Sequence, residues 1–174
     1  ILPQFDKGDT GKYINSPETA IFQKSKLLYG FWKSKNPIRE AGGAFLVEGQ
    51  MDFLMTWQSG MKNVIATSGT ALTVEHLRTL RRATDRLVLS FDSDEAGLNA
   101  LERAIDLAEA EDFGVKIARL GQYKDPADAV VADPTFLPKA VAEAVPAPQF
   151  YFDRYLPAKS DLKDRDYLGK LRLV

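Results

Sequence analysis

Four short apolar runs alternate with helical patterns between residues 43 and 120, and this alternation limits the fold more than any other feature of the chain. The runs read AFLVE, NVIAT, LVLSF and VKIARL. Between them, apolar side chains recur every three or four residues, as on one face of an α-helix. Short connections between alternating strands and helices predict βαβ units and a parallel sheet covered on both faces. We expect strands at 44–48, 63–67, 87–91 and 115–120, and helices at 50–59, 73–83, 95–110, 127–132 and 135–144.

The composition excludes several kinds of site. Apolar residues make up 45% of the 174 residues and charged residues 27%, as in a globular protein. There is no cysteine and only one histidine, His76, so disulfides and zinc sites built on thiolates or several histidines are excluded. No apolar run approaches the roughly 20 residues that span a bilayer. We therefore expect no membrane association and a cytoplasmic location.

Acidic residues follow two of the predicted strands. Glu48 closes the first strand, and Asp92 and Asp94 follow the third in the stretch SFDSDEAG. Ligands of open parallel sheets bind outside the carboxyl ends of the strands. If the first and third strands are neighbours, the backbones at Glu48 and Asp92 lie only ~5 Å apart. The sequence then predicts that these three carboxylates converge at one end of the sheet.

Converging carboxylates repel one another, and a bound cation relieves that repulsion. Mg²⁺ suits a site of oxygen ligands with one or two direct carboxylates and several waters. Alternate residues of an extended segment point to one side, so Asp92 and Asp94 can both face an ion while Ser93 points away. The alternative is that such acids favour helix starts through the helix dipole, which is the role we expect for Glu95.

Basic residues gather in two places. Residues 1–40 carry seven lysines and arginines against four acids, which suits an anionic partner but also suits an ordinary protein surface. Four arginines near the helix at 73–83 either touch a phosphate group or form a solvated face, and these are Arg78, Arg81, Arg82 and Arg86. We expect His76 to be a surface residue of this helix.

Longer motifs resemble a known family. The segments EGQMD (48–52) and FDSDEAG (91–97) resemble the Toprim domain, which holds magnesium with a Glu after its first strand and an Asp-x-Asp after its third. The surrounding sequence resembles the catalytic core of DnaG-type bacterial primases. The segments that carry this likeness are GKYINSPET (11–19), FQKSKLLYG (22–30), ATSGTALT (66–73) and YKDPADAVV (123–131).

The resemblance assigns roles to individual residues. The catalytic and main metal-binding acids it implies are Glu48, Asp92 and Asp94. The supporting acids of the metal cluster are Asp52 and Asp125. The residues implied in binding nucleotide phosphates and template are Lys12, Tyr13, Asn15 and Lys24. The family has Asp-Pro-Asp in its last motif, whereas this chain has Asp125-Pro126-Ala127-Asp128, so the second acid is displaced by one residue. Either Asp128 takes the place of this ligand, or the ligand is absent.

The activity implied is synthesis of an RNA primer on a single-stranded DNA template from ribonucleoside triphosphates, with Mg²⁺ as cofactor and Mn²⁺ able to substitute. The implied partner is a replicative helicase, bound through a domain absent from this chain. Two alternatives stay open: a Toprim nuclease or topoisomerase fragment, and a fragment that only binds nucleotide and nucleic acid. We expect an α/β fold divided into a partial basic subdomain (1–42), a Toprim domain (43–146) and the start of a truncated helical subdomain (147–174).

Overall fold

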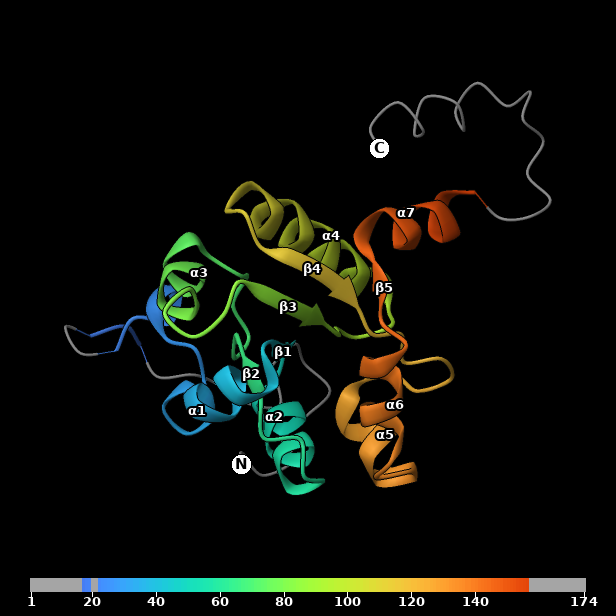
Figure 1. The fold of residues 1–174 in the computed structure, drawn as a ribbon, viewed down its shortest axis with the longest axis horizontal. Coiled ribbons are helices and arrows are strands. Elements are labelled where there is room, and N and C mark those ends of the chain that lie inside the picture. The colour runs from blue at the N-terminus through green and yellow to red at the C-terminus, as the bar shows by residue number, and fades with distance from the viewer. Residues whose placement is uncertain (1–16, 20–21, 157–174) are drawn as a thin grey trace, which may run out of the picture.

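The structure is a computed structural model that describes residues 17–19 and 22–156 of the chain. Its centre is a five-stranded sheet with the strand order β2–β1–β3–β4–β5 (Figure 1). Strands β1 to β4 pair in parallel, and β5 joins β4 as an antiparallel strand. The strands are β1 (Ala44–Val47), β2 (Val64–Ala66), β3 (Arg86–Leu89), β4 (Gly114–Ile117) and β5 (Val145–Pro146).

Helices cover both faces of this sheet, as the continuous apolar strands require. Helices α1, α3, α4 and α7 pack on one face, and α2, α5 and α6 pack on the other (Figure 1). The helices are η1 (Lys24–Lys26, a 3-10 helix), α1 (Phe31–Ala41), α2 (Gln50–Gln58), α3 (Val74–Leu80), α4 (Glu95–Ala110), α5 (Pro126–Ala132), α6 (Phe136–Ala142) and α7 (Ala147–Tyr155).

Strand β1 shows how the two cores are divided. Successive side chains of a strand point to opposite faces. Ala44 and Leu46 accordingly lie in the core beneath α3 and α4, and Phe45 and Val47 lie in the core beneath α2 and α5. All four residues are fully buried. A polar residue inside this strand would face one core or the other, so charge is confined to the strand ends.

Short antiparallel segments lie along both edges of the parallel sheet. On the β2 edge, the Tyr29 N–H donates to the Ala66 carbonyl at 2.8 Å, and the Ala66 N–H donates back at 3.1 Å. On the other edge, β5 pairs with β4 through Val145 and Pro146. Proline has no N–H to give a further strand, which suits Pro146 to this outer position.

The structure confirms the expected order of parallel strands and intervening helices and adds three elements, η1, α1 and β5. Helix α4 spans 95–110 as predicted. Strand β5 was not predicted, because two residues are too short to show an alternating pattern. Helix α1 was also missed, since its lysines and the internal Pro37 obscure the apolar face on which Ile38 is buried.

The last described helix packs on the same sheet as the rest. Ala147 and Phe150 of α7 are buried in the core formed with α4 and β4. The division of the chain into subdomains at 42/43 and 146/147 stays a prediction. Among the described residues, no helix combines the length and the apolar character needed to cross a membrane.

Candidate active site

Strands β1 and β3 are direct neighbours, as the convergence of Glu48 and Asp92 requires. Leu46 of β1 is in register with Leu89 of β3, and the Ser90 N–H donates to the Leu46 carbonyl at 3.0 Å just beyond the ladder. Helix α2, which follows β1, packs on one face, and α4, which follows β3, packs on the other. A crevice at such a switch in direction is where open α/β sheets bind ligands.

Glu48 leaves the end of β1 on a loop whose backbone is fixed from the β2 side. The Glu48 carbonyl accepts hydrogen bonds from the Ser68 N–H at 2.9 Å and the Gly69 N–H at 3.4 Å. Its half-buried carboxyl has a raised pKa, first because of burial and then because of the charges of Asp92 and Asp94. The three carboxylates predicted to converge therefore share one electrostatic environment.

Asp52, in the first turn of α2, links two segments that are far apart in the sequence. Its Oδ2 accepts from the Gly49 N–H at 3.0 Å, and its Oδ1 accepts from the Ala127 N–H of α5 at 3.1 Å. Burial raises the pKa of Asp52 to about 6, and the charges of Asp125 and Asp92 add to this effect. The two backbone hydrogen bonds act in the opposite direction. Asp52 therefore joins α2 to α5 while adding charge to the crevice.

The two aspartates of the Asp-x-Asp motif differ in their surroundings. Asp92 is half-buried, and its pKa is raised by burial and by the charges of Asp125 and Asp94, with Lys124 opposing them. Asp94 is exposed and caps α4, because its Oδ1 accepts from the Gly97 N–H at 2.8 Å. Glu95 is the first helical residue and the acid of the first turn of α4, as expected, and Asp94 caps the helix one residue earlier.

Two neighbours hold this motif in place. A Cβ atom on Gly97 would lie 2.3 Å from the Asp92 carbonyl oxygen, so only glycine lets α4 approach the backbone of Asp92 this closely. Ser93 donates to the Lys124 carbonyl from its N–H at 2.9 Å and from its hydroxyl at 3.1 Å. Ser93 therefore ties the loop after β3 to the loop before α5, which brings Asp125 near Asp92.

The last acidic motif contributes one of its two acids to this environment. Asp125 caps α5, with its Oδ1 accepting from the Asp128 N–H at 2.7 Å, and its charge raises the pKa of Asp52 and Asp92. Asp128 is exposed in the first turn of α5, and its Oδ2 accepts a hydrogen bond from the backbone N–H of Lys124 at 3.4 Å. The role of Asp128 as a metal ligand stays a prediction. We refer to Glu48, Asp52, Asp92, Asp94 and Asp125 as the strand-end acids.

The strand-end acids suit a hydrated divalent cation better than a fully protein-ligated one. Within the described ranges, no three acidic or histidine side chains come close enough together to bind one ion directly. The pKa values of Glu48, Asp52 and Asp92 are raised first by burial and then by the charges of neighbouring strand-end acids. Mg²⁺ is bound through one or two carboxylates while it keeps several waters, so this oxygen-only donor set fits it.

A small cavity lies beside the Glu48 loop. Its volume is about 150 Å³. Lys24 lines it from η1 and is the one predicted nucleotide-binding residue within the described ranges, because Lys12, Tyr13 and Asn15 lie outside them. The residues that line the cavity are Phe22, Lys24, Leu27, Tyr29, Gln50, Thr67 and Ser68.

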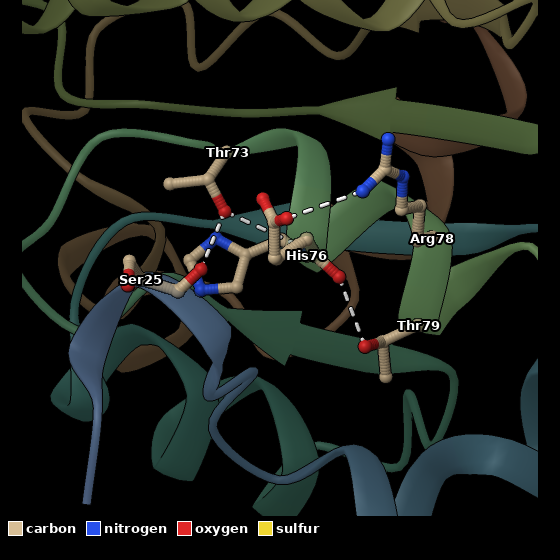
Figure 2. A network of polar contacts seen from close by, with 6 residues as sticks. Ser25, Thr73, His76, Arg78 and Thr79 are labelled. Carbon is tan, nitrogen blue, oxygen red and sulfur yellow. Dashed lines mark hydrogen bonds and ion pairs between the residues drawn. The ribbon is translucent and has the colours of Figure 1, made fainter.

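The expectation that His76 lies on the surface is wrong, because the structure buries it completely. The imidazole lies between α3 and the segment that carries Ser25 (Figure 2), and its Nε2 is 2.9 Å from the Lys24 carbonyl oxygen. The sequence carried a signal for this burial: His76 lies four residues from both Leu72 and Leu80, on the apolar stripe of α3.

The arginines of this region make local contacts. Arg78 pairs with Glu75 at 3.2 Å, and Arg81 lies over the ring of Phe113 at 4.3 Å while its guanidinium donates to the Asp112 carbonyl. These contacts favour a structural role for Arg78 and Arg81 over contact with a template phosphate.

Comparisons with known proteins agree with this geometry. Residues 45–130 match the family described as Toprim-like, and residues 4–35 match the N-terminal domain of the DNA primase catalytic core. A DNA primase of Halalkalibacterium halodurans is 43% identical over 120 residues, which are 69% of this chain and 20% of that protein. The E. coli primase catalytic core aligns with a TM-score of 0.78 at 31% identity, covering 95% of this chain and 54% of that structure.

A solved DnaG primase catalytic domain bound to single-stranded DNA aligns with a TM-score of 0.77 at 31% identity, covering 95% of this chain and 55% of that structure. The sheet, with Glu48 after β1 and Asp92 and Asp94 after β3, therefore defines a Toprim-like domain. The family that combines this domain with the matched N-terminal segment is narrower. The chain belongs to the bacterial DnaG primase family, and it spans about a fifth of the curated relative's length.

Proposed function

We propose that this chain provides the metal-binding half of a DNA primase active site, which joins ribonucleotides into a primer on single-stranded DNA. The observation that supports this most directly is the pairing of β1 with β3, which brings the strand ends that carry Glu48 and the Asp92-x-Asp94 motif to one edge of the sheet, in a chain of the primase family. The proposed step is attack of a ribonucleotide 3′-hydroxyl on the α-phosphate of a ribonucleoside triphosphate, with release of pyrophosphate.

The cofactor proposed for this site is Mg²⁺, with Mn²⁺ able to substitute. When bound, such an ion activates the attacking hydroxyl and neutralises charge on the triphosphate. Glu48 and Asp92 would hold the ion directly from the ends of the two neighbouring strands, and Asp94, at the start of α4, would bind it through the waters that Mg²⁺ keeps. Asp52 and Asp125 would support the site by their negative charge, and Asp128 is a further candidate ligand.

Phosphate groups would be held by basic residues beside the ion. Lys24 lines the cavity next to the Glu48 loop, so its ammonium group can meet a phosphate there as a point charge. Lys12, Tyr13 and Asn15 are proposed for the same role from their motif alone. The chemistry then requires no side-chain nucleophile, since catalysis of phosphoryl transfer rests on positioning and electrostatics.

The proposed partners are a single-stranded DNA template, ribonucleoside triphosphates and the growing RNA primer, in the cytoplasm. A structural relative has single-stranded DNA bound, which supports the template. Contact with a replicative helicase stays a prediction. The Toprim nuclease and topoisomerase alternative is less well supported, because residues 4–35 match a primase-specific segment.

The test replaces the strand-end charges in the intact primase that contains this chain. We expect Glu48→Gln and Asp92→Asn each to lower primer synthesis on single-stranded DNA by about a hundredfold or more, as removal of one electrostatic contact to a transition state does. Synthesis would be measured by incorporation of labelled ribonucleotides. Far-UV circular dichroism should show an unchanged fold, because neither side chain is part of the core.

Asp106→Asn is the matched control, since it removes a carboxylate from the exposed face of α4. This variant should synthesise primers at the wild-type rate. Wild-type yields from both the Glu48 and the Asp92 variants would contradict the proposed function, whereas nicking of supercoiled DNA by the wild-type chain would favour the nuclease alternative.

A further inference from the structure

His76 connects α3 to the segment that carries Lys24. The imidazole is fully buried, and its Nε2 lies 2.9 Å from the backbone carbonyl oxygen of Lys24, which is 52 positions earlier in the chain. A carbonyl oxygen can only accept a hydrogen bond, so Nε2 must carry a proton for this contact to form.

The environment favours the neutral ring with its proton on Nε2. Burial lowers the pKa of His76, and the carbonyls of Lys24 and Leu27 oppose this only in part. Within the described residues, Nδ1 is buried without a hydrogen-bond partner, as expected for the unprotonated nitrogen of that tautomer. The single N–H of the ring is thus committed to the Lys24 carbonyl.

Thr73 supplies a second link between the same two segments. Its hydroxyl donates to the Ser25 carbonyl at 2.6 Å and accepts from the His76 N–H at 3.1 Å (Figure 2). The start of α3 is therefore bound to two successive carbonyls of η1, at Lys24 and Ser25. A short 3-10 helix has little internal hydrogen bonding, so these external contacts decide where it lies.

The position of η1 sets the position of the Lys24 side chain. That side chain lines the small cavity together with Gln50 and Thr67, which flank the Glu48 loop. The Thr67 N–H donates to the Val47 carbonyl at 3.3 Å, so this wall of the cavity is an extension of the sheet. One wall of the cavity is thus part of the sheet, and the wall formed by Lys24 depends on its contacts with α3.

We propose that His76 is a positioning residue that holds Lys24 at the cavity for contact with a phosphate group. The inference rests on the proposed function, in which Lys24 binds phosphate. The phosphate belongs either to a ribonucleoside triphosphate or to the backbone of single-stranded DNA, and the chemistry of the contact is the same in both cases. Thr73 assists by fixing the next carbonyl of η1.

The test is a double-mutant cycle on the 174-residue chain, with binding of a fluorescent ATP analogue and of labelled oligothymidylate as separate arms in the presence of Mg²⁺. We expect His76→Leu to raise the Kd about tenfold in at least one arm, the amount typical of one lost charge-assisted contact. In a Lys24→Ala background the same change should have no further effect, because His76 acts through Lys24.

Conservative variants separate positioning from general stability. His76→Gln places an N–H donor where Nε2 stands and should restore binding, and Thr73→Val should weaken it less than His76→Leu does. Ser34→Ala is the matched control: it removes a buried hydrogen bond, from the hydroxyl to the Val64 carbonyl at 2.5 Å, far from η1. This control should bind both ligands as the wild type does.

The outcomes separate the positioning role of His76 from the phosphate-binding role of Lys24. If Lys24→Ala weakens binding while His76→Leu and Thr73→Val do not, the role of His76 is overturned and the proposed function stands. If Lys24→Ala leaves both arms unchanged, the phosphate role of Lys24 is wrong and the inference fails with it. An effect of His76→Leu that persists undiminished in the Lys24→Ala background would show a structural role only.

Discussion

Two acid-rich regions within the described residues differ in what surrounds their carboxylates. One is the strand-end acids, and the other is a groove of about 760 Å³ between α4 and α7. In the groove, Glu102 pairs with Arg154 at 2.7 Å and accepts from the Tyr155 hydroxyl at 2.6 Å, while Asp106 accepts from the Tyr151 hydroxyl at 3.1 Å. Side chains of α7 therefore neutralise or hydrogen-bond these acids of α4.

The strand-end acids have far less such compensation. Among the described residues, the charges acting on Glu48 are those of two other acids, and Lys124 is the one cation that acts on Asp92. Buried or crowded carboxylates without cations respond by taking up protons or by binding a metal. Acids of the groove can thus hold two helices together, whereas the strand-end acids store repulsion that a cation can relieve.

The largest effect that would sharpen this contrast concerns Asp94, which caps α4 and which we propose as a metal ligand as well. Asp94→Ser keeps a cap for α4 but removes the carboxylate, so primer synthesis by the intact primase should fall about a hundredfold or more while the melting temperature hardly changes. Asp94→Ala should lose the same activity and in addition destabilise the chain by about 1 kcal/mol. Primer assays and thermal denaturation of both variants measure the two effects.

Glu102→Gln is the control from the groove and should leave primer synthesis unchanged. If Asp94→Ser retained full synthesis, the carboxylate of Asp94 would be only a helix cap, and the contrast between the two regions would be lost at this residue.

The next effect is on the pH dependence of stability without metal. Since folding raises the pKa of Asp52 from 3.8 to about 6, its contribution is fully present below pH 3.8 and is lost as the pH rises through 6. The free energy of unfolding should fall by roughly 2 to 3 kcal/mol over this range through Asp52 alone. Asp52→Asn should remove this component, as urea denaturation in a chelating buffer at several pH values would show.

A variant of the groove serves as the control for this measurement. Glu102→Gln should keep the same decline between pH 3.8 and 6 as the wild type. An identical decline in Asp52→Asn would mean that the crowding of charge around Asp52 does not destabilise the fold.

The smallest effect is the stabilisation by the metal itself. At a concentration ten times its Kd, Mg²⁺ should stabilise the folded chain by about 1.4 kcal/mol, which raises the melting temperature by roughly 3–6 °C. Glu48→Gln combined with Asp92→Asn should abolish this rise, and Glu102→Gln should keep it. A rise that survives the double change but disappears in Glu102→Gln would assign the cation to the groove and reverse the comparison.

Sequence patterns were sufficient for the parts of the fold that depend on local periodicity. Alternating apolar runs predicted most of the strands and helices. Carboxylates at the strand ends, together with the family motifs, predicted the candidate metal site. The adjacency of β1 and β3 had to be assumed, because strand order depends on packing between distant segments. The structure confirms that assumption.

Contacts between distant segments explain what the sequence did not reveal. The hydrogen bond from the Ala127 N–H to Asp52 joins residues 75 positions apart, so no local pattern reports it. His76 looked like a solvated residue because histidine is polar, yet it is buried where one carbonyl of η1 needs a donor. The capping role of Asp94 was missed because a helix cap and a metal ligand call for the same kind of side chain.

The paired edges of the sheet have a consequence for behaviour in concentrated solution. An open edge strand presents unpaired N–H and C=O groups to which another chain can add. Here Tyr29 occupies part of the β2 edge, and β5 covers β4 and ends in Pro146. These short segments leave little template for strand addition between molecules, so the sheet can expose its acidic strand ends to ligand without also promoting self-association.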